Sequence, residues 1–174
     1  MSTKEDLKNI IALEEKGYGR SSLIRRYLRE LRICEYYKNC GGGTARLLFK
    51  LHNFYRNRLG LRLGFEIPLN VFGKGLHIFH TGNIIINETS SVGEYCNIIG
   101  STCLGSKDGG NGPTIGNHCE LGMNSVVIGN VKIGNNVYIG AGAVVTKSFE
   151  QDGVSLAGVP AKIVASRKDS KKAD

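Results

Sequence analysis

The residues best suited to chemistry near neutral pH are four histidines, His52, His77, His80 and His118. Histidine is the natural general base in this range because its unperturbed pKa lies near 6.5. A base of this kind usually has a carboxylate that fixes its tautomer and orientation. Which histidine can act therefore depends on the elements that carry it and on what they place beside it.

Composition excludes several classes of protein. The chain has 174 residues, enough for one domain or for one repeat domain with a helical attachment. Five cysteines without a C-x-x-C pair argue against a disulfide framework or a zinc knuckle and for a reducing compartment. The start lacks the apolar region of a signal peptide, and no eighteen consecutive residues are apolar, so we expect a cytosolic protein.

The first third of the chain has helical periodicity. Apolar residues at spacings of three and four predict three short helices within residues 4–60. Gly17-Tyr18-Gly19 separates the first helix from the second, which Ser21 or Ser22 can cap. A run of three glycines at 41–43, with Thr44 as the next cap, separates the second from a third at about 44–59.

The positive charge is concentrated in these helices. Residues 20–62 contain eleven Lys/Arg against two Glu, so this segment alone has a net charge of +9. The arginines are either the solvated faces of amphipathic helices or a basic surface for an anionic substrate or phospholipid headgroups. A nucleic-acid binder is disfavoured, because the chain lacks regularly placed aromatic residues for base stacking and any recognised binding motif.

From residue 71 onward the pattern changes to a six-residue repeat. Each aliphatic residue of the repeat is followed, four positions later, by a small residue, a β-branched residue or a cysteine. Such side chains fit a tight interior corner. The frame resumes upstream with a two-residue slip between Ile84 and Val92, and residues 106–113 form a loop ejected from the coil. The aliphatic positions in perfect register are Ile115, Leu121, Val127, Ile133, Ile139 and Val145.

A period of six predicts a parallel β-helix, in which short strands turn about every six residues and each coil pairs with its neighbours. Three hexads make one coil, so residues 66–149 make roughly four to five coils. The chain then divides into a helical cap at 1–62, a β-helix at 63–150 and a C-terminal segment with a disordered tail at 151–174. An open coil end is an exposed β-edge, which the helices would cap.

The predicted elements distinguish the histidines. His52 lies in the third helix and is interpreted as a packing or surface residue, whereas His118 occupies a corner and either faces solvent or lines a cleft between subunits. His77 ends a hexad at a corner and could touch substrate. His80 follows Ile78 by two, within a strand rather than at a glycine corner. It is the best candidate for a base, with a structural corner histidine as the alternative.

Three features together resemble a known family. They are the segment GLHIFHTG at 75–82, the perfect hexads and the ending AGVPAKI at 157–163. They resemble the hexapeptide acyltransferases with a left-handed β-helix, and more narrowly the serine O-acetyltransferase family and its polysaccharide-modifying relatives. The resemblance covers about residues 60–164. It implies a left-handed β-helix, acetyl-CoA as the acyl donor, and a homotrimer with active sites between subunits.

The resemblance also implies roles for individual residues. His80 matches the family's catalytic histidine, and Glu66 stands where the family has the aspartate that pairs with it, although an exposed glutamate without such a role is the alternative. Acetyl transfer from a thioester to an alcohol needs a base, a donor for the developing oxyanion and a slot for the pantetheine arm, and it requires no metal.

The family pattern places the cofactor along three small residues, Gly105, Ala141 and Gly142. Lys147 and Lys162 would meet the CoA phosphates, or be ordinary surface lysines. The glycine-rich loop 106–113 is expected to cover the acceptor of an adjacent subunit.

Two departures from the family pattern concern the acceptor. Phe79 replaces the family's acidic residue before the catalytic histidine, and the family's second histidine falls on Gly112. Both family residues help to bind the amino-acid acceptor. We therefore expect an O-acetyltransferase acting on a small-molecule or lipid-linked sugar of a surface-polysaccharide precursor. The alternatives are serine O-acetylation in cysteine biosynthesis and, from another class, a non-catalytic β-helix scaffold.

Overall fold

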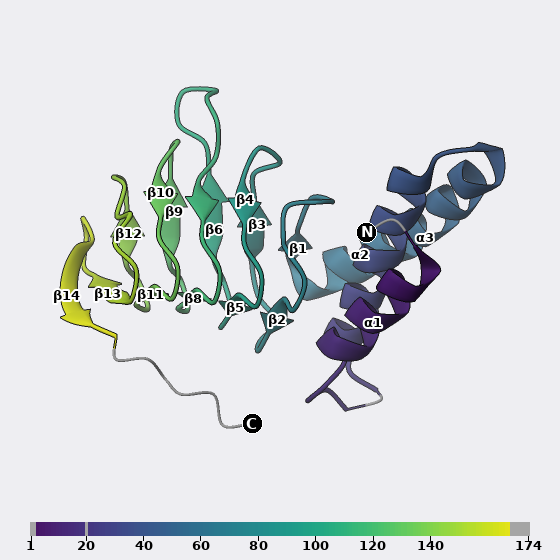
Figure 1. Ribbon diagram of the computed structural model, residues 1–174, viewed down its shortest axis with the longest axis horizontal. Helices are drawn as coiled ribbons and strands as arrows, with labels where there is room; N and C mark the ends of the chain where they lie inside the picture. Colours follow the sequence, from purple (N-terminus) through teal and green to yellow (C-terminus); the bar gives the residue numbers. More distant parts are fainter. Residues whose placement is uncertain (1–2, 20, 168–174) are drawn as a thin grey trace.

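The computed structural model describes residues 3–19 and 21–167, so the expected disordered tail from residue 168 lies outside the described residues. Three helices lead into a left-handed parallel β-helix of about five turns (Figure 1). This arrangement confirms the predicted fold class. Within the described part of the chain, no helix is long and apolar enough to cross a membrane.

The helices begin at clear local signals. A reciprocal capping box between Thr3 and Asp6 starts the first helix, and the Ser22 side chain accepts a hydrogen bond from the Arg25 amide at the start of the second. The third helix begins at Gly43, with Gly42 rather than Thr44 as its N-cap. The three helices are α1 (Lys4–Glu14), α2 (Leu23–Cys40) and α3 (Gly43–Leu63).

Helix α3 runs four residues beyond the predicted end at 59, for a packing reason. Leu63 is buried, and a Cβ on Gly60 would lie only 2.7 Å from the Phe65 carbonyl oxygen, so the helix can pass this close to the first strand only with glycine. Gly64 then ends the helix in the left-handed region at φ 77°. Helix and β-helix are therefore joined without a linker.

The coils stack into three sheets, in which every pair of neighbouring strands is parallel except the last pair of the six-stranded sheet. The five-stranded sheet contains β1 (Phe65–Glu66), β3 (Ile84–Ile86), β6 (Cys103–Gly105), β9 (Val126–Ile128) and β12 (Val144–Val145). The three-stranded sheet contains β4 (Ser91–Val92), β7 (Thr114–Ile115) and β10 (Lys132–Ile133). The six-stranded sheet contains β2 (His77–Ile78), β5 (Asn97–Ile98), β8 (Glu120–Leu121), β11 (Tyr138–Ile139), β13 (Val154–Ala157) and β14 (Lys162–Ser166).

The hexad residues form the core, as the repeat predicts. The six aliphatic positions from 115 to 145 are each at most 4% exposed, and the small or β-branched positions between them are buried as well. Equivalent residues pair across coils: Leu121 pairs with Ile139 eighteen positions later, which is three hexads. Each aliphatic side chain therefore stacks on its equivalents in the neighbouring coils.

Two irregularities leave this stacking intact. Ile98 pairs with Leu121 twenty-three positions later, because the loop at 106–113 adds five residues that leave the coil between β6 and β7 (Figure 1). Ile78 pairs with Ile98 twenty positions later, which accommodates the two-residue slip. The coil also continues past residue 150, since β13 pairs with β11 and β14 then folds back antiparallel onto β13.

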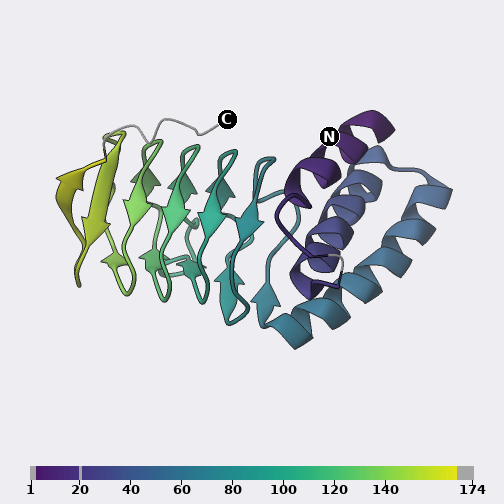
Figure 2. The same cartoon turned by 90° about the horizontal axis from the view of Figure 1, so that it is seen from below.

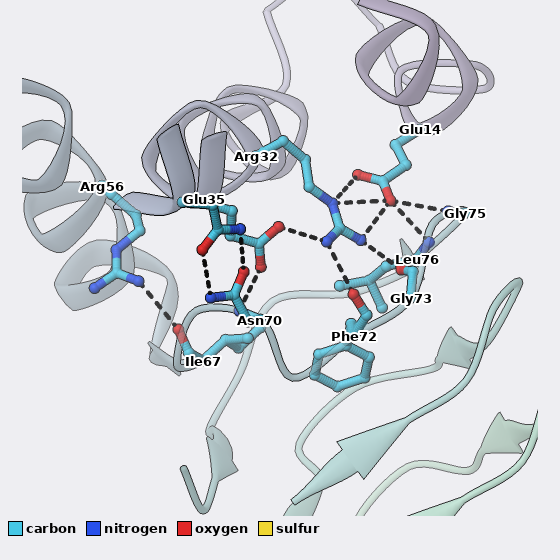
Figure 3. Close-up of polar contacts among 11 residues, drawn as sticks. Glu14, Arg32, Glu35, Arg56, Ile67, Asn70, Phe72, Gly73, Gly75 and Leu76 are labelled. Atoms are coloured by element: carbon cyan, nitrogen blue, oxygen red, sulfur yellow. Dashed lines mark hydrogen bonds and ion pairs between the residues drawn. The ribbon is translucent and has the colours of Figure 1, made fainter. Parts of the chain in front are cut away.

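The first coil has no preceding coil to pair with, and charged side chains from the helices take that place (Figure 3). Arg32 donates to the carbonyl oxygens of residues 72 and 73 at 3.0 and 2.6 Å. Glu14 Oε1 accepts from the amides of residues 75 and 76 at 2.9 and 3.1 Å. Arg32 also pairs with Glu14 and Glu35 at 2.7 Å each, and all three side chains are at most 5% exposed.

Three further side chains complete this capping of the first coil. The Tyr18 hydroxyl accepts from the Ile78 amide at 2.8 Å and donates to the Ile78 carbonyl at 2.7 Å, as a neighbouring strand would. Glu35 accepts from the Asn70 amide and Arg56 donates to the Ile67 carbonyl. Helices and β-helix are thus locked together through backbone groups that would otherwise be buried without partners.

The carboxylates of Glu14 and Glu35 hold Arg32 in its ionised form. Burial alone would lower the pKa of Arg32, but hydrogen bonds and the negative charges of Glu14 and Glu35 outweigh burial and raise that pKa. Removing the guanidinium would leave two buried carboxylates and two carbonyl oxygens without their partner.

We predict that Arg32→Met lowers the free energy of unfolding by about 3–5 kcal/mol, because breaking a buried ion pair leaves uncompensated charge. Arg29→Met is the matched control: Arg29 lies on the same helix but is 54% exposed, so its loss should cost under about 1 kcal/mol. Urea unfolding followed by circular dichroism measures both. Equal losses in the two variants would contradict a structural role for the buried cluster.

Candidate active site

His80 lies at an exposed corner between the six-stranded and five-stranded sheets, just after β2, so its expected position within a strand was wrong. His77, expected at a corner, lies in β2 itself. The next coils place Gly100, Met123 and then Ala141 and Gly142 at the same corner as His80. We call His80 and these four residues the histidine edge. Neighbouring strands are about 4.8 Å apart, so the edge runs roughly 14 Å from His80 to Ala141 along the coil axis.

Three of the five residues of the histidine edge are glycine or alanine. A Cβ on Gly100 would lie 3.3 Å from the His80 Cβ and 3.4 Å from the Met123 Cε, so a larger residue below the histidine would require both neighbours to shift. Gly142 adopts φ 68° and its amide donates to the Met123 carbonyl at 2.8 Å. An exposed imidazole above such a surface can accept a proton from a hydroxyl group brought to it.

An aromatic cluster supports the strand that precedes His80. His77 stacks on Tyr18 with ring centroids 4.6 Å apart, and Phe79 packs edge-on against His77 at the same distance. Burial raises the pKa of Tyr18 to about 12, so its hydroxyl keeps the proton that it donates to Ile78. Burial lowers the pKa of His77, which favours a neutral ring at pH 7.

Glu66 lies on β1 and faces outward from the five-stranded sheet. It lines an open groove of about 1100 Å³ together with Arg56, Ile85 and Gly105. Within residues 3–19 and 21–167, no hydrogen bond or ion pair joins Glu66 to His80. Two of the expected site residues, Glu66 and Gly105, therefore share one groove, and His80 is not among the residues that line it.

The residues expected to bind the cofactor lie on two edges of the five-stranded sheet. Ala141 and Gly142 belong to the histidine edge. Gly105 ends β6 immediately before the loop 106–113, and Lys147 follows β12 with its Nζ 5.4 Å from the Phe149 ring centre. Lys162 begins β14 and is exposed. One chain alone does not gather these residues into a single groove.

The loop 106–113 is anchored to the preceding coil at Gly112. The Gly112 amide donates to the Thr89 hydroxyl at 2.7 Å, and a Cβ at this position would collide with the Ser90 hydroxyl oxygen. A histidine would therefore not fit at Gly112 without movement of the coil.

The remaining histidines and the inward cysteines have structural surroundings. His52 Nδ1 lies 2.7 Å from Glu30 Oε2 and joins α3 to α2, which agrees with a packing residue. His118 is exposed at a corner, as expected, and stacks on Tyr95. Cys96 and Cys119 are buried in the coil, as the repeat predicts.

Sequence reasoning missed the role of Tyr18. The sequence predicts only a break between helices at 17–19, yet Tyr18 holds the backbone two residues before His80. The signal that could have found it is an aromatic residue with a hydroxyl group between two glycines.

Residues 112–147 match the model of the family described as bacterial transferase hexapeptide, with six repeats. Serine acetyltransferase of Synechococcus elongatus is 37% identical over 108 residues, which cover 60% of this chain and 44% of that protein. Serine acetyltransferase of Staphylococcus epidermidis is 33% identical over 132 residues, 74% of this chain and 58% of that protein. The chain is a hexapeptide-repeat protein related to the serine acetyltransferases. The resemblance seen in its motifs is confirmed.

Solved structures agree on the fold of this hexapeptide-repeat protein. Serine acetyltransferase from Brucella abortus in complex with coenzyme A superposes with a TM-score of 0.79 at 19% identity, covering 95% of this chain and 70% of that chain. Neisseria gonorrhoeae serine acetyltransferase in complex with serine superposes with a TM-score of 0.69 at 24% identity, covering 91% and 69%. The hexapeptide-repeat protein spans about half the length of the curated relatives it matches.

The lowered pKa of His77 predicts a pH effect on stability of the hexapeptide-repeat protein. The unfolded chain binds a proton on this histidine near pH 6.5, but the folded chain binds it only at lower pH. The contribution to stability is therefore fully present above pH 6.5 and is lost as pH falls through the folded pKa. In His77→Phe, urea midpoints should fall less than in the wild type between pH 7 and pH 5. Above pH 7.5 the plots of urea midpoint against pH should be parallel for the two proteins. Plots that stay parallel between pH 7 and pH 5 would contradict the lowered pKa of His77.

Proposed function

We propose that this protein is an acetyl-CoA-dependent O-acetyltransferase that moves an acetyl group to an acceptor hydroxyl. The observation that carries the proposal is the histidine edge, where an exposed histidine is followed along the coils by two glycines, an alanine and the flexible Met123 over a length that suits an extended thiol arm. The names of the curated relatives and the coenzyme A complex of a structural neighbour support it.

In the proposed reaction His80 is the general base. Its unprotonated ring nitrogen takes the proton of the acceptor hydroxyl while the hydroxyl oxygen attacks the thioester carbonyl carbon. The carbon–sulfur bond breaks when the tetrahedral intermediate collapses, and the sulfur receives the proton back from the imidazolium. The products are an O-acetyl ester and the free thiol. Glu66 is the proposed orienting carboxylate, in the place of the family's aspartate.

The arrangement of the expected cofactor residues supports a homotrimer with sites between subunits. The histidine edge and the edge that carries Gly105, Lys147 and the loop 106–113 lie on opposite sides of the five-stranded sheet. A neighbouring subunit could place its edge with Gly105, Lys147 and the loop 106–113 against the histidine edge, which would bring the two groups of cofactor residues together. Lys162 from the C-terminal segment would then lie near the CoA phosphates. The loop would then cover the acceptor.

L-Serine is the first candidate acceptor, because the relatives named above are serine acetyltransferases. They favour serine over the polysaccharide sugar expected from the sequence. A sugar hydroxyl remains the second candidate because of two local observations: Phe79, 48% exposed, stands beside His80, and Gly112 has no room for a side chain. Neither residue supplies a charge for the ammonium or carboxylate of an amino acid.

We predict that His80→Ala lowers turnover by about 10²–10⁴, the usual contribution of a general base, and that Glu66→Gln lowers it less. His118→Ala is the matched control and should keep the wild-type rate, because His118 is exposed at another corner and stacks only on Tyr95. The measurement is thiol release from acetyl-CoA in the presence of acceptor.

Light scattering serves as the control for assembly, and all these variants should have the mass of three 18.9 kDa chains. A folded His80→Ala protein that retains more than about a third of the rate would exclude His80 as the base. A monomer that turns over substrate would exclude the shared site. Absence of acetyl transfer with any acceptor would favour the non-catalytic scaffold.

The two acceptors can be separated at Phe79. If serine is the substrate, Phe79→Asp should lower its KM by about tenfold, because a carboxylate near the base can pair with the ammonium group of the acceptor. Phe54→Asp, on the exposed side of α3, is the control and should leave KM unchanged. The measurement that separates the two acceptors is steady-state kcat/KM for L-serine and for a panel of nucleotide-linked sugars. Serine at background with efficient acetylation of a sugar would reject serine.

A further inference from the structure

The outward side of α3 carries an apolar stripe without a partner in the described chain. Leu47, Leu51, Phe54 and Leu61 follow one another at spacings of four, three and seven, which places them on one face of the helix. Their exposed fractions are 69, 50, 56 and 86%. These values are high for large apolar residues, and burial of such a stripe against another surface would be favourable.

The same helix is uniformly basic. α3 contains five Lys/Arg and no Asp or Glu. By the helical period, Lys50, Arg58 and Arg62 lie within or beside the apolar stripe rather than on the packed side. Arg58 lies 5.9 Å from the centre of the Phe54 ring, which places a cation directly on an exposed aromatic residue.

Helix α2 extends this basic surface. Arg26 and Arg29 line a shallow groove of about 410 Å³ together with Arg58 and Arg62. One acidic residue, Glu30, also lines the groove, but its carboxylate is already paired with His52. Arg29 is partly engaged by Glu15 at 3.6 Å. The groove therefore remains positively charged after its own acidic partners are counted.

The position of α3 makes this face accessible. α2 lies between α1 and α3, so α3 forms the outer side of the helical cap, and the coils of the β-helix lie on the other side of the cap (Figure 2). The outward face of α3 can therefore be reached from the side of the cap away from the coils, except at its C-terminal end, where Leu61 lines a groove with residues of the first coils.

The mixture of groups selects the kind of partner. Apolar side chains interleaved with cations suit the interface of an anionic bilayer, where leucines and phenylalanine enter the acyl boundary and arginines meet phosphates. A second copy of the same face would set Lys50, Arg58 and Arg62 near like charges, with no acidic residue on α3 to pair with them. Charge complementarity therefore favours a lipid surface over self-association.

We propose that the outward face of α3, with the arginines of α2 beside it, is a docking surface for a membrane rich in anionic phospholipid. The apolar stripe provides the area that is buried, and the basic residues provide selectivity for negative headgroups. The proposal does not depend on the proposed acetyl transfer. It would hold the protein at the membrane surface without a membrane-spanning segment.

The test is co-sedimentation of the full chain with large vesicles of phosphatidylcholine that contain about a third phosphatidylglycerol, compared with pure phosphatidylcholine. We expect binding to the anionic vesicles only, weakened by added sodium chloride. Lys50→Glu with Arg62→Glu should lower the partition coefficient at least about tenfold, since each basic residue near such a surface contributes about fivefold. Leu47→Gln with Leu51→Gln should lower it by a similar factor at unchanged charge.

Lys16→Glu with Lys132→Glu is the matched control, because both lysines are exposed and lie away from α3. This variant has the same net charge as the α3 charge variant and should keep most of the binding. Circular dichroism checks that each variant is folded.

Five results would overturn the proposal. The first three are equal binding to neutral vesicles, no binding to anionic vesicles, and equal losses in the α3 charge variant and its control. The fourth is a smaller assembly for Leu47→Gln with Leu51→Gln in vesicle-free solution, which would identify the face as a contact between copies. Sodium phosphate should release the protein no more than chloride at equal ionic strength. Selective release by phosphate would assign the groove to a soluble phosphate ligand and would also reject membrane docking.

Discussion

The unpaired backbone of the first coil is the constraint on which the rest of this structure depends. A parallel coil satisfies its amides and carbonyls through its neighbours, so the first coil needs a substitute for the neighbour it lacks. Arg32, Glu14, Glu35 and Tyr18 supply that substitute from helices rather than from a strand. Each of these side chains bonds to one or two backbone groups of the first coil. The helical cap therefore does not need the regular spacing of a strand to satisfy that edge.

This capping reaches the candidate site directly. Tyr18 makes two hydrogen bonds to Ile78 and stacks on His77, so a residue from the loop between α1 and α2 fixes the backbone just ahead of His80. The helices therefore do more than close the end of the β-helix. They determine where the corner that carries His80 begins, and the small residues of the histidine edge then continue from that corner along the coils.

The β-helix could be predicted from the sequence because its rule is local. One apolar residue in six must face the core, and residues such as Leu121 and Ile139 obey this rule without reference to distant parts of the chain. The cap could not be predicted in the same way. Arg32 and Glu35 read as part of a solvated helix face, and only the position of the free coil edge explains why charged residues are buried among leucines. For the same reason the role of Gly60, and with it the length of α3, escaped the helical pattern.

The site divides along a similar line. His80 could be singled out because it follows the core residue Ile78 by two, but the pattern placed it in a strand, whereas the folded coil places it at an exposed corner that suits a base. The relation of Glu66 to His80 escaped the repeat because Glu66 on β1 precedes the clear hexads, where counting gives no register. The separation of Ala141 and Gly142 from Gly105 and Lys147 is also a property of the folded coil, which the spacing of the residues along the chain does not reveal.

The most direct test of the capping by helices is amide hydrogen exchange in the first coil of the native protein, followed residue by residue. The amides of Asn70, Gly75, Leu76 and Ile78 should be protected as strongly as amides of the inner coils, because Glu35, Glu14 and Tyr18 accept their hydrogen bonds. In Tyr18→Phe, the amide of Ile78 should lose protection while those of residues 75 and 76 keep it. Exchange of all four amides at the rate of an exposed loop in the wild type would contradict the account.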